Sequence, residues 1–439
     1  MVDSARGSTT HAEIEEIAAM ATPLDGPTGL DPLIDRLRHV RVALLGEASH
    51  GTSEYYRCRA TITQRLVAEG GAGFIAVEGD WPDCFRVNQW VKGREDQHLG
   101  AREVLGKFNR WPTWMWANEE VAEFIEWLRE HNLQTGADVG FYGLDVYSLW
   151  ESLDRIMHYL TDRAPDAVEA ARTALRCFDP YHEDPQQYAR ATRLIPTSCE
   201  DEVVDLLAEM HRRPPRPGDE PESDLDAIQN AEVLQGAERY YRTMVRADSE
   251  SWNVRDRHMA DTLDRLLEHH GPGSRGVVWE HNTHVGDARA TDMARAGMVN
   301  VGQLARERHG HDDVALVGFA GRRGSVIAAS AWGAPMRRID VPEAPSKTHE
   351  DLLHRAAPGR SLLVFPEQRD SPWLSAVRGH RAIGVVYRPE IDHLGNWIPT
   401  RMGGRYDALC AFDTTEALHP LELERVEVTA EQDTAPWGT

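Results

Sequence analysis

The hydrophobic pattern of this chain alternates between short apolar runs and longer segments in which apolar residues recur every three or four positions. Runs of the first kind have the length of buried strands, and segments of the second kind have the period of amphipathic helices. The alternation predicts an α/β fold with a mainly parallel central sheet flanked by helices. The expected central strands are residues 42–46, 73–77, 139–143, 276–279 and 314–319.

The third and fourth of these strands are separated by a long stretch with helical periodicity and almost no strand signal. We expect a large helical insertion there, interrupted at the proline-rich segment 212–218 by an exposed loop. Beyond Gly321, β-like runs predict additional C-terminal strands at 325–329, 361–365, 382–387 and 406–412. The expected organisation is an N-terminal part of the α/β core (1–147), the helical insertion (148–270), a C-terminal part of the core (271–420) and a C-terminal tail (421–439).

Polar side chains follow four of the predicted strands at the point where each strand ends. Open α/β sheets bind their ligands at the carboxyl edge of the strands, so these side chains predict one shared site. They are Glu47 and His50, Glu78 and Asp80, Asp145, and finally Glu280, His281 and His284.

His50 is the candidate general base of this site. Its unperturbed pKa near 6.5 leaves much of an imidazole neutral at pH 7, and a carboxylate such as Glu47 can fix the tautomer. Arg59 lies about two and a half turns further along the expected helix 53–69, so helix tilt decides whether it reaches the site. The alternative is that Glu47 caps this helix and its arginines form surface ion pairs.

Glu78 and Asp80 cannot both be buried and ionised without a cation or hydrogen-bond donors. Arg59 is the natural partner in the sequence. The alternative is a helix N-terminus in which Asp80 is the cap and Pro82 lies in the first turn, and that role is compatible with catalysis.

A metal centre is a second interpretation of the same groups. Glu47, His50, Glu78, Asp80, His281 and His284 offer enough ligands for one or two divalent metals. However, the chain has no HExxH or HxHxDH pattern, and these residues serve a metal-free general-base site equally well.

The residues expected to contact a substrate are Asp80, Trp81, Trp116 and Asp145. Trp81 and Trp116 belong to an aromatic group, with Trp90, Trp111, Trp114 and Tyr142, that can line a broad cleft for a bulky apolar small molecule. Ordinary core packing explains most of this group. Arg255 and His258 share a helix face at i,i+3 and are expected to anchor the insertion to the sheet rather than touch substrate.

Charge and composition limit the partners. The net charge of −23 and pI near 5.3 come from acidic residues spread along the chain, which argues against nucleic acid. The five cysteines form neither a CxxC pair nor a disulfide framework, so we expect a reducing cytoplasm. No signal layout and no run of about 18 apolar residues occurs, so a soluble protein without a membrane partner is expected. The sequence leaves the oligomeric state open.

Four motifs together resemble the erythromycin esterase family, and the likeness extends over residues 11–420. They are GEASHG at 46–51, EGDWP at 78–82, WNVRDRHM at 252–259 and WEHNTH at 279–284. The resemblance implies an α/β core with a large helical portion and hydrolysis of the lactone ester of macrolide antibiotics by an activated water. It implies His50 as general base, Glu47 as its support, Arg59 and Glu78 lining the site, and His281 and His284 as further active-site residues. It also implies no tightly bound catalytic metal or other cofactor.

One position departs from the family. Ala117, in the tryptophan-rich segment 110–118, stands where an arginine is common, so the substrate need not be a macrolide. Two alternatives to a lactone hydrolase remain. One is an enzyme of the same scaffold that performs cyclisation or elimination on a natural-product intermediate, and the other is a metal-dependent hydrolase or metal-binding protein. An acyl-serine route through Ser49 is not expected, because the chain has no GxSxG elbow.

Overall fold

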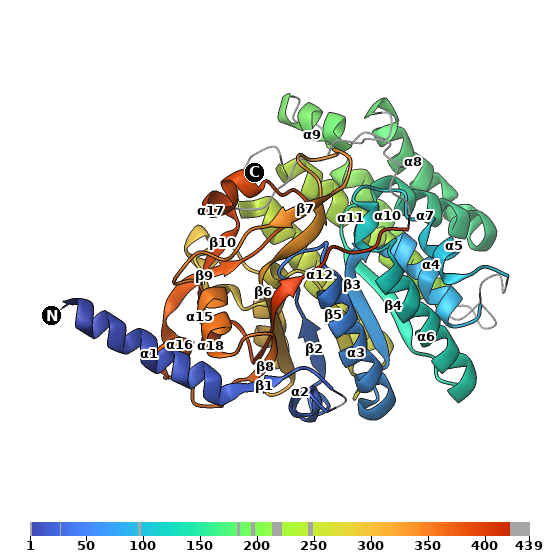
Figure 1. The fold of residues 1–439 in the computed structure, drawn as a ribbon. Coiled ribbons are helices and arrows are strands. Elements are labelled where there is room, and N and C mark those ends of the chain that lie inside the picture. Colours follow the sequence, from blue (N-terminus) through green and yellow to red (C-terminus); the bar gives the residue numbers. More distant parts are fainter. Residues whose placement is uncertain are drawn as a thin grey trace.

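The computed structural model describes residues 2–26, 28–94, 98–181, 185–194, 198–212, 222–244 and 249–421. Within these residues, the centre is a nine-stranded sheet with helices on both faces (Figure 1). Eight strands follow the order β1-β8-β11-β6-β2-β5-β3-β4, and β7 pairs with β6. Their bounds are Ala21–Pro23 (β1), Val42–Leu45 (β2), Phe74–Asp80 (β3), Gly140–Asp145 (β4), Gly276–Trp279 (β5), Val314–Ala328 (β6), Arg337–Val341 (β7), Arg360–Val364 (β8) and Ala408–Thr415 (β11).

The middle of the sheet is parallel, which confirms the predicted fold class. β11, β6, β2, β5, β3 and β4 run in one direction. At one edge β8 is antiparallel to β11 and β1 is antiparallel to β8, and β7 is antiparallel to β6. All five predicted central strands are present. Because they are parallel, their carboxyl ends meet at one edge of the sheet.

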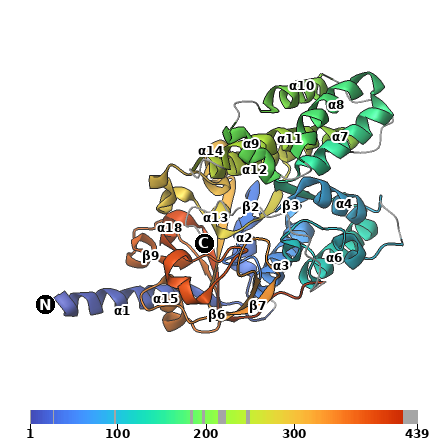
Figure 2. The same cartoon turned by 90° about the horizontal axis from the view of Figure 1, so that it is seen from above.

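Alternating side chains of the strands build two separate core layers. Leu45, Val77 and Trp279 face α2, α3 and α6 on one side. Leu44 and Val278 face α12 and α14 on the other. Figure 2 shows the two helical layers on opposite sides of the sheet. The bounds of these helices are Asp31–Leu37 (α2), Ser53–Gly70 (α3), Glu119–Thr135 (α6), Ser249–His269 (α12) and Val301–His309 (α14).

Further helices complete the two layers. α1 (Val2–Met20) projects from the body at the N-terminus and leads into β1 (Figure 1). α4 begins directly after β3 with Asp80 as its N-cap residue and proline in its first turn, as predicted, although the Asp80 side chain makes no capping hydrogen bond. The remaining bounds are Trp81–Val91 (α4), Ala101–Leu105 (α5), Asn282–Val285 (α13), His349–Ala356 (α15), Pro372–Ser375 (α16), Asp392–Gly395 (α17) and Met402–Arg405 (α18).

The predicted helical insertion is present between β4 and β5 and has a hydrophobic core of its own. In Figure 2 it lies at one end of the molecule, on the same side of the sheet as α12 and α14. Of the proline-rich segment 212–218, only Arg212 is among the described residues, so the predicted loop lies outside them. The bounds of the helices before α12 are Leu149–Arg163 (α7), Val168–Phe178 (α8), Pro185–Leu194 (α9), Glu200–His211 (α10) and Ser223–Met244 (α11).

The C-terminal strands differ from the prediction in two places. Runs 314–319 and 325–329 fall on the single strand β6, which continues through Gly321 by pairing with β11. The Tyr55 hydroxyl occupies the space that a side chain at 321 would need. Run 382–387 is not a strand. Its backbone instead makes isolated bonds to Ala48 and Ala329, while an unpredicted hairpin forms from Val377–Arg381 (β9) and Trp397–Arg401 (β10).

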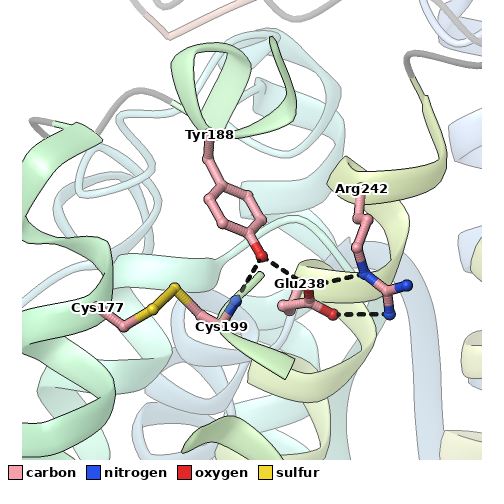
Figure 3. Close-up of a disulfide and its surroundings, with 5 residues drawn as sticks. All are labelled: Cys177, Tyr188, Cys199, Glu238 and Arg242. Carbon is pink, nitrogen blue, oxygen red and sulfur yellow. Dashed lines mark hydrogen bonds and ion pairs between the residues drawn. A yellow bond between two sulfur atoms is a disulfide. The ribbon is translucent and has the colours of Figure 1, made fainter. Parts of the chain in front are cut away.

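The absence of a disulfide was predicted wrongly. Cys177 and Cys199 are bonded, with 5.8 Å between their Cα atoms, and join the end of α8 to the start of α10 (Figure 3). The Tyr188 hydroxyl of the intervening α9 donates to Glu238 at 2.6 Å and accepts from the Cys199 N–H at 3.0 Å. This bond removes the cysteine argument for a reducing compartment. None of the described helices is both long and apolar enough to cross a membrane.

Candidate active site

A cavity of about 310 Å³ opens at the carboxyl edge of the parallel strands. Its floor is polar and comes from the ends of β2, β3, β4 and β5, as the sequence predicts. The predicted residues that line it are His50, Glu78, Asp80, Trp116, Asp145, His281 and His284. Residues that are far apart in the chain therefore line the same cavity.

His50 is held by a buried chain of charged groups. Its Nδ1 lies 2.8 Å from Glu47 Oε1, and the other oxygen of Glu47 lies 2.7 Å from the Arg59 guanidinium. Arg59 is fully buried, with its guanidinium 4.2 Å from the ring centre of Tyr56 and 5.0 Å from that of Trp279. Glu47 and Arg59 thus lie behind the wall of the cavity. They orient His50 and do not contact what binds there.

His281 lies beside His50, with 4.8 Å between the ring centres. It precedes α13, and its Nδ1 accepts from the Thr283 N–H at 3.4 Å and lies 2.8 Å from the Thr283 hydroxyl. Since Nδ1 is an acceptor, the ring proton lies on Nε2. This Nε2 is buried and has no hydrogen-bond partner among the described residues. The ring offers an unused donor next to His50.

Arg255 is the central cation of the cavity, and the sequence did not identify it as such. From α12 its guanidinium reaches Asp145 at 2.7 and 2.9 Å and Glu78 at 2.7 Å. Glu78 also accepts from the backbone N–H of His281 at 2.8 Å. Arg255 therefore anchors the insertion to two strand ends, as expected, and also lines the cavity.

His284 is fixed from three sides. Its Nδ1 lies 2.9 Å from Asp256, Arg255 donates to its Nε2 at 3.1 Å, and the indole of Trp252 stacks on its ring at 4.6 Å with the planes 7° apart. All three partners come from α12. The WNVRDRHM motif is thus the helix that holds the WEHNTH loop.

Asp80 pairs with Arg110 rather than with Arg59. Arg110 Nε donates to one Asp80 oxygen at 2.7 Å, and a second guanidinium nitrogen contacts the other. Burial raises the pKa of Asp80 to about 7, against the opposing effect of Arg110. A carboxyl of the cavity wall therefore titrates near neutral pH.

The local charges separate the pKa values of the two neighbouring histidines. Burial alone would lower the pKa of His50, but the negative charges of Glu78 and Glu47 outweigh it and raise that pKa above its ordinary value. Burial, reinforced by His50, holds the pKa of His281 well below its ordinary value. Burial would raise the pKa of Glu78, but His284 and Arg255 outweigh it and keep that pKa low. His281 is therefore neutral at pH 7 and Glu78 is ionised.

Aromatic and aliphatic side chains form another part of the cavity lining. Trp116 lies in the wall, where its indole N–H donates to the Glu78 carbonyl at 3.1 Å, and Trp111 and Trp332 pack against each other at 4.6 Å. Phe108, Met115 and Leu394 continue this surface, and Leu394 is 71% exposed.

Trp81 does not line the cavity, which corrects the prediction. As the first residue of α4 it points toward the helical insertion, where its indole N–H donates to Asp226 at 2.8 Å and its ring stacks on Tyr142. Trp90, Trp114 and Tyr142 are core residues too, as the packing alternative predicted.

Two other expectations concern nucleophile and metal. Ser49 is buried and hydrogen-bonded to Thr52, so it does not face the cavity. Among the described residues, three potential metal-ligand atoms lie within 4.8 Å of one another at Glu222, His269 and His270, away from the cavity. Lys92 and Arg94 already bind the Glu222 carboxylate there, each at 2.8 Å.

Proteins of known structure share this arrangement of the chain. A succinoglycan biosynthesis protein superimposes with a TM-score of 0.75 at 19% identity, covering 94% of this chain and 99% of that one. A Bacillus cereus protein gives 0.77 at 16% identity, with coverages of 94% and 99%. A mutant of the erythromycin esterase EreC in its open conformation gives 0.66 at 14% identity, with coverages of 91% and 97%. At these identities the likeness shows the fold.

Fold and site together define an α/β protein with a histidine and carboxylate centre at the ends of its parallel strands. The sequence model of the erythromycin esterase family matches residues 67–415, and the chain belongs to that family. It is 27% identical over 124 residues to an erythromycin esterase type II of Escherichia coli, and this alignment spans 28% of each protein. Family membership indicates a hydrolase.

Proposed function

We propose that the protein hydrolyses a cyclic ester, a macrolide or another natural-product lactone, with water activated by His50. The observation that carries this proposal is the pairing of His50, fixed through Nδ1 by Glu47, with a neutral His281 whose Nε2–H has no partner among the described residues. Ester hydrolysis needs both a base and a donor for the oxyanion, and these two rings lie side by side.

In the proposed reaction, Nε2 of His50 takes a proton from water, and the resulting hydroxide attacks the lactone carbonyl. The imidazolium is stabilised by Glu47, whose charge is in turn held in place by Arg59. As the tetrahedral intermediate collapses, the same proton passes to the leaving alkoxide and the ring opens to a hydroxy acid. His50 is thereby returned to its neutral form.

The negative oxygen of the intermediate is stabilised by the Nε2–H of His281. One such donor typically contributes about 3 to 4 kcal/mol to the transition state. Arg255 supplies positive charge from the opposite side of Glu78. Arg59 is completely buried behind Glu47, so His281 and Arg255 are the better candidates for this role.

We propose that this reaction proceeds without a bound metal. Two of the carboxylates that the sequence offered as metal ligands already pair with arginines: Glu78 lies 2.7 Å from Arg255, and Asp80 accepts from Arg110 at 2.7 Å. These two carboxylates therefore already have compensating cations from the protein.

The substrate we propose is bulky and partly apolar. The reacting groups lie at the floor of the cavity, while Trp111, Trp332 and Leu394 provide an apolar outer wall. A ring with one polar ester edge and a large hydrocarbon face matches this division.

The test is a screen of macrolides and smaller lactones in water enriched in oxygen-18, read by mass spectrometry. Hydrolysis adds the elements of one water molecule and places the label in the new carboxylate. His50→Ala should abolish turnover while changing the free energy of unfolding by no more than about 1 to 2 kcal/mol.

His158→Ala is the matched control, because this exposed histidine of α7 lies outside the cavity. It should leave turnover unchanged. A product with the mass of its substrate would instead identify cyclisation or another isomerisation. Full activity of His50→Ala would reject the general-base role, and activity lost on chelation and restored by a metal would reject the metal-free reaction.

A further inference from the structure

Glu280 is a buried carboxyl group that the proposed reaction does not use. It follows β5 directly and is fully buried. Neither of its carboxyl oxygens has a hydrogen-bond partner among the described residues. An ionised carboxylate in such a position costs several kcal/mol unless a cation or a donor compensates it.

The sheet determines where Glu280 points. Its backbone N–H donates to the Leu45 carbonyl at 3.3 Å, so the pairing of β5 with β2 continues one residue past Trp279. Side chains alternate along an extended strand, and Val278 packs in the core layer that contains Met259 and Leu263 of α12. Glu280 therefore faces α12 as well.

α12 presents a second carboxyl to the same layer. Asp256 precedes Met259 by three positions and so shares its helix face. Its Oδ1 is near Nδ1 of His284, at 2.9 Å, and accepts from the Val301 N–H at 3.1 Å. Its Oδ2 is buried without a partner among the described residues. Three carboxyl oxygens of two facing residues thus lack a donor within the part of the chain that the structure describes.

We propose that Glu280 is a neutral carboxylic acid that donates a hydrogen bond to Oδ2 of Asp256 and thereby acts as a positioning residue for His284. A carboxylate only accepts hydrogen bonds, so one added proton is what two facing carboxyl groups need. Asp256 keeps the negative charge: burial raises its pKa, but His284, Arg255 and the hydrogen bond from the Val301 N–H oppose this increase.

The electrostatic surroundings agree with this assignment. Burial, followed by the negative charges of Glu78 and Asp256, raises the pKa of Glu280 well above its ordinary value. The charged groups around it are Glu78 from β3, Asp145 from β4, and Arg255 and Asp256 from α12. Three carboxylates against one guanidinium favour the protonated acid.

The shared proton fixes the tautomer of His284. Asp256, held by Glu280, takes the hydrogen bond from the Nδ1–H, so Nε2 carries the lone pair. Arg255 then donates to that Nε2 at 3.1 Å, as a guanidinium must, because it has no acceptor atom. Glu280 acts on the cavity through Asp256 and His284 and does not contact what binds there.

Infrared difference spectroscopy tests the proposal without a substrate. The spectrum of the wild type minus that of Glu280→Gln, recorded at pH 7, should contain the carbonyl stretch of a protonated carboxylic acid. In Asp256→Asn this stretch should shift, because the charged acceptor of its hydrogen bond is lost. The same shift of the carbonyl stretch should appear in the spectrum of the wild type minus that of Asp256→Asn. This second difference spectrum tests the proposal even if Glu280→Gln does not fold.

Glu350→Gln is the matched control. Glu350 is equally buried but is bonded to His380 at 2.7 Å and to the Arg381 N–H at 2.8 Å, so its substitution should remove the bands of an ionised carboxylate. Bands of an ionised carboxylate in the Glu280→Gln difference, or a protonated band that does not respond to Asp256→Asn, would overturn the proposal.

The consequence for turnover rests on the proposed function and is measured separately. The amide introduced by Glu280→Gln can still donate to Asp256, whereas Glu280→Leu leaves Asp256 with a stronger pull on the His284 proton. Arg255 can donate only to a neutral His284, so protonation of His284 adds a second ionisation to the acid limb of kcat/KM beside that of His50. This limb should stay in place in Glu280→Gln and move to higher pH in Glu280→Leu, and the movement should vanish in the Asp256→Asn background. Identical limbs in both variants would overturn the positioning role, while the absence of any lactone turnover would count against the proposed function alone.

Discussion

At the scale of single residues, the site depends on two neighbouring histidines whose pKa values are shifted in opposite directions. His50 faces Glu47 and the charge of Glu78, which favour its protonated form, whereas His281 is buried with only Thr283 at its Nδ1 among the described residues. An acid and a base assignment follows when neighbouring groups have pKa values that are pushed apart. His50 and His281 have the same imidazole ring, so the difference between their pKa values comes from the carboxylates near His50.

This difference predicts the pH dependence of turnover. A general base must be neutral, and the pKa of His50 is raised, so kcat/KM should increase as the pH rises through a value above 6.5. Glu47→Gln removes two of the interactions that raise the pKa of His50, so the acid limb should move to lower pH. The measurement is the pH profile of kcat/KM together with an NMR titration of His50. An acid limb below pH 6.5 in the wild type, or one unaffected by Glu47→Gln, would contradict this assignment.

At the scale of elements, α12 joins the helical insertion to the catalytic edge. It supplies Trp252, Arg255 and Asp256, and these contact β3, β4 and the loop after β5. Because α12 carries both core residues and cavity residues, a shift of this helix would also move side chains of the site. The stability of the insertion is therefore relevant to catalysis as well as to folding.

The disulfide of the insertion gives a prediction at this scale. Cys177 and Cys199 are 22 residues apart, and closing a loop of this length stabilises a fold by about 3 kcal/mol. The double variant Cys177→Ser, Cys199→Ser should lose this amount in chemical denaturation. Hydrogen exchange should show the loss in α9, whose Tyr188 is hydrogen-bonded beside the bridge (Figure 3).

A dithiol reductant distinguishes the bridge from simple packing. It should lower the stability of the wild type to that of the double variant and leave the variant unaffected. Cys58→Ser, which replaces a free thiol, is the control and should respond to the reductant as the wild type does. A wild type of unchanged stability in the reductant would show that the bridge does not stabilise the insertion.

At the scale of the whole molecule, folding buries several histidines in their neutral form. Burial lowers the pKa of His349 to about 3 and that of His258 to about 3. The unfolded chain binds a proton at each below about pH 6.5, while the folded chain does not. Each such histidine therefore makes the free energy of unfolding fall as the pH falls from about 6.5 toward about 4.

Because other groups titrate in the same window, the prediction concerns a difference between proteins. His349 lies at 2.9 Å from the Thr400 carbonyl, and His349→Gln retains an amide donor there. Relative to the wild type, this variant should gain about 1.4 kcal/mol of stability for each pH unit between about 6 and 4. Denaturant titrations at several pH values measure this gain. His158→Gln, on the exposed face of α7, should show no such trend, and a flat difference for His349→Gln would mean that His349 is protonated in the folded state.

Much of the fold could be predicted from local sequence because strand length and helical period are local properties. Strand 276–279 was predicted with its observed bounds, and helix 53–69 ends one residue later in the structure. β6 and run 382–387 could not be predicted in this way. β6 continues past Gly321 by pairing with β11, and run 382–387 bonds to residues distant in the chain.

The sequence alone determined that His50, Glu78, Asp145, His281 and His284 share one site, because parallel strands place their carboxyl ends at one edge. Tertiary structure decided which charges pair there. Arg59 of α3 reaches Glu47 and Arg255 of α12 reaches Glu78, since these helices pack on opposite faces of the sheet. Arg110, from the segment between α5 and α6, reaches Asp80. Tertiary structure also decided the partner of Trp81 and the pairing of Cys177 with Cys199. Their partners lie on other helices, so the local sequence pattern could not predict them.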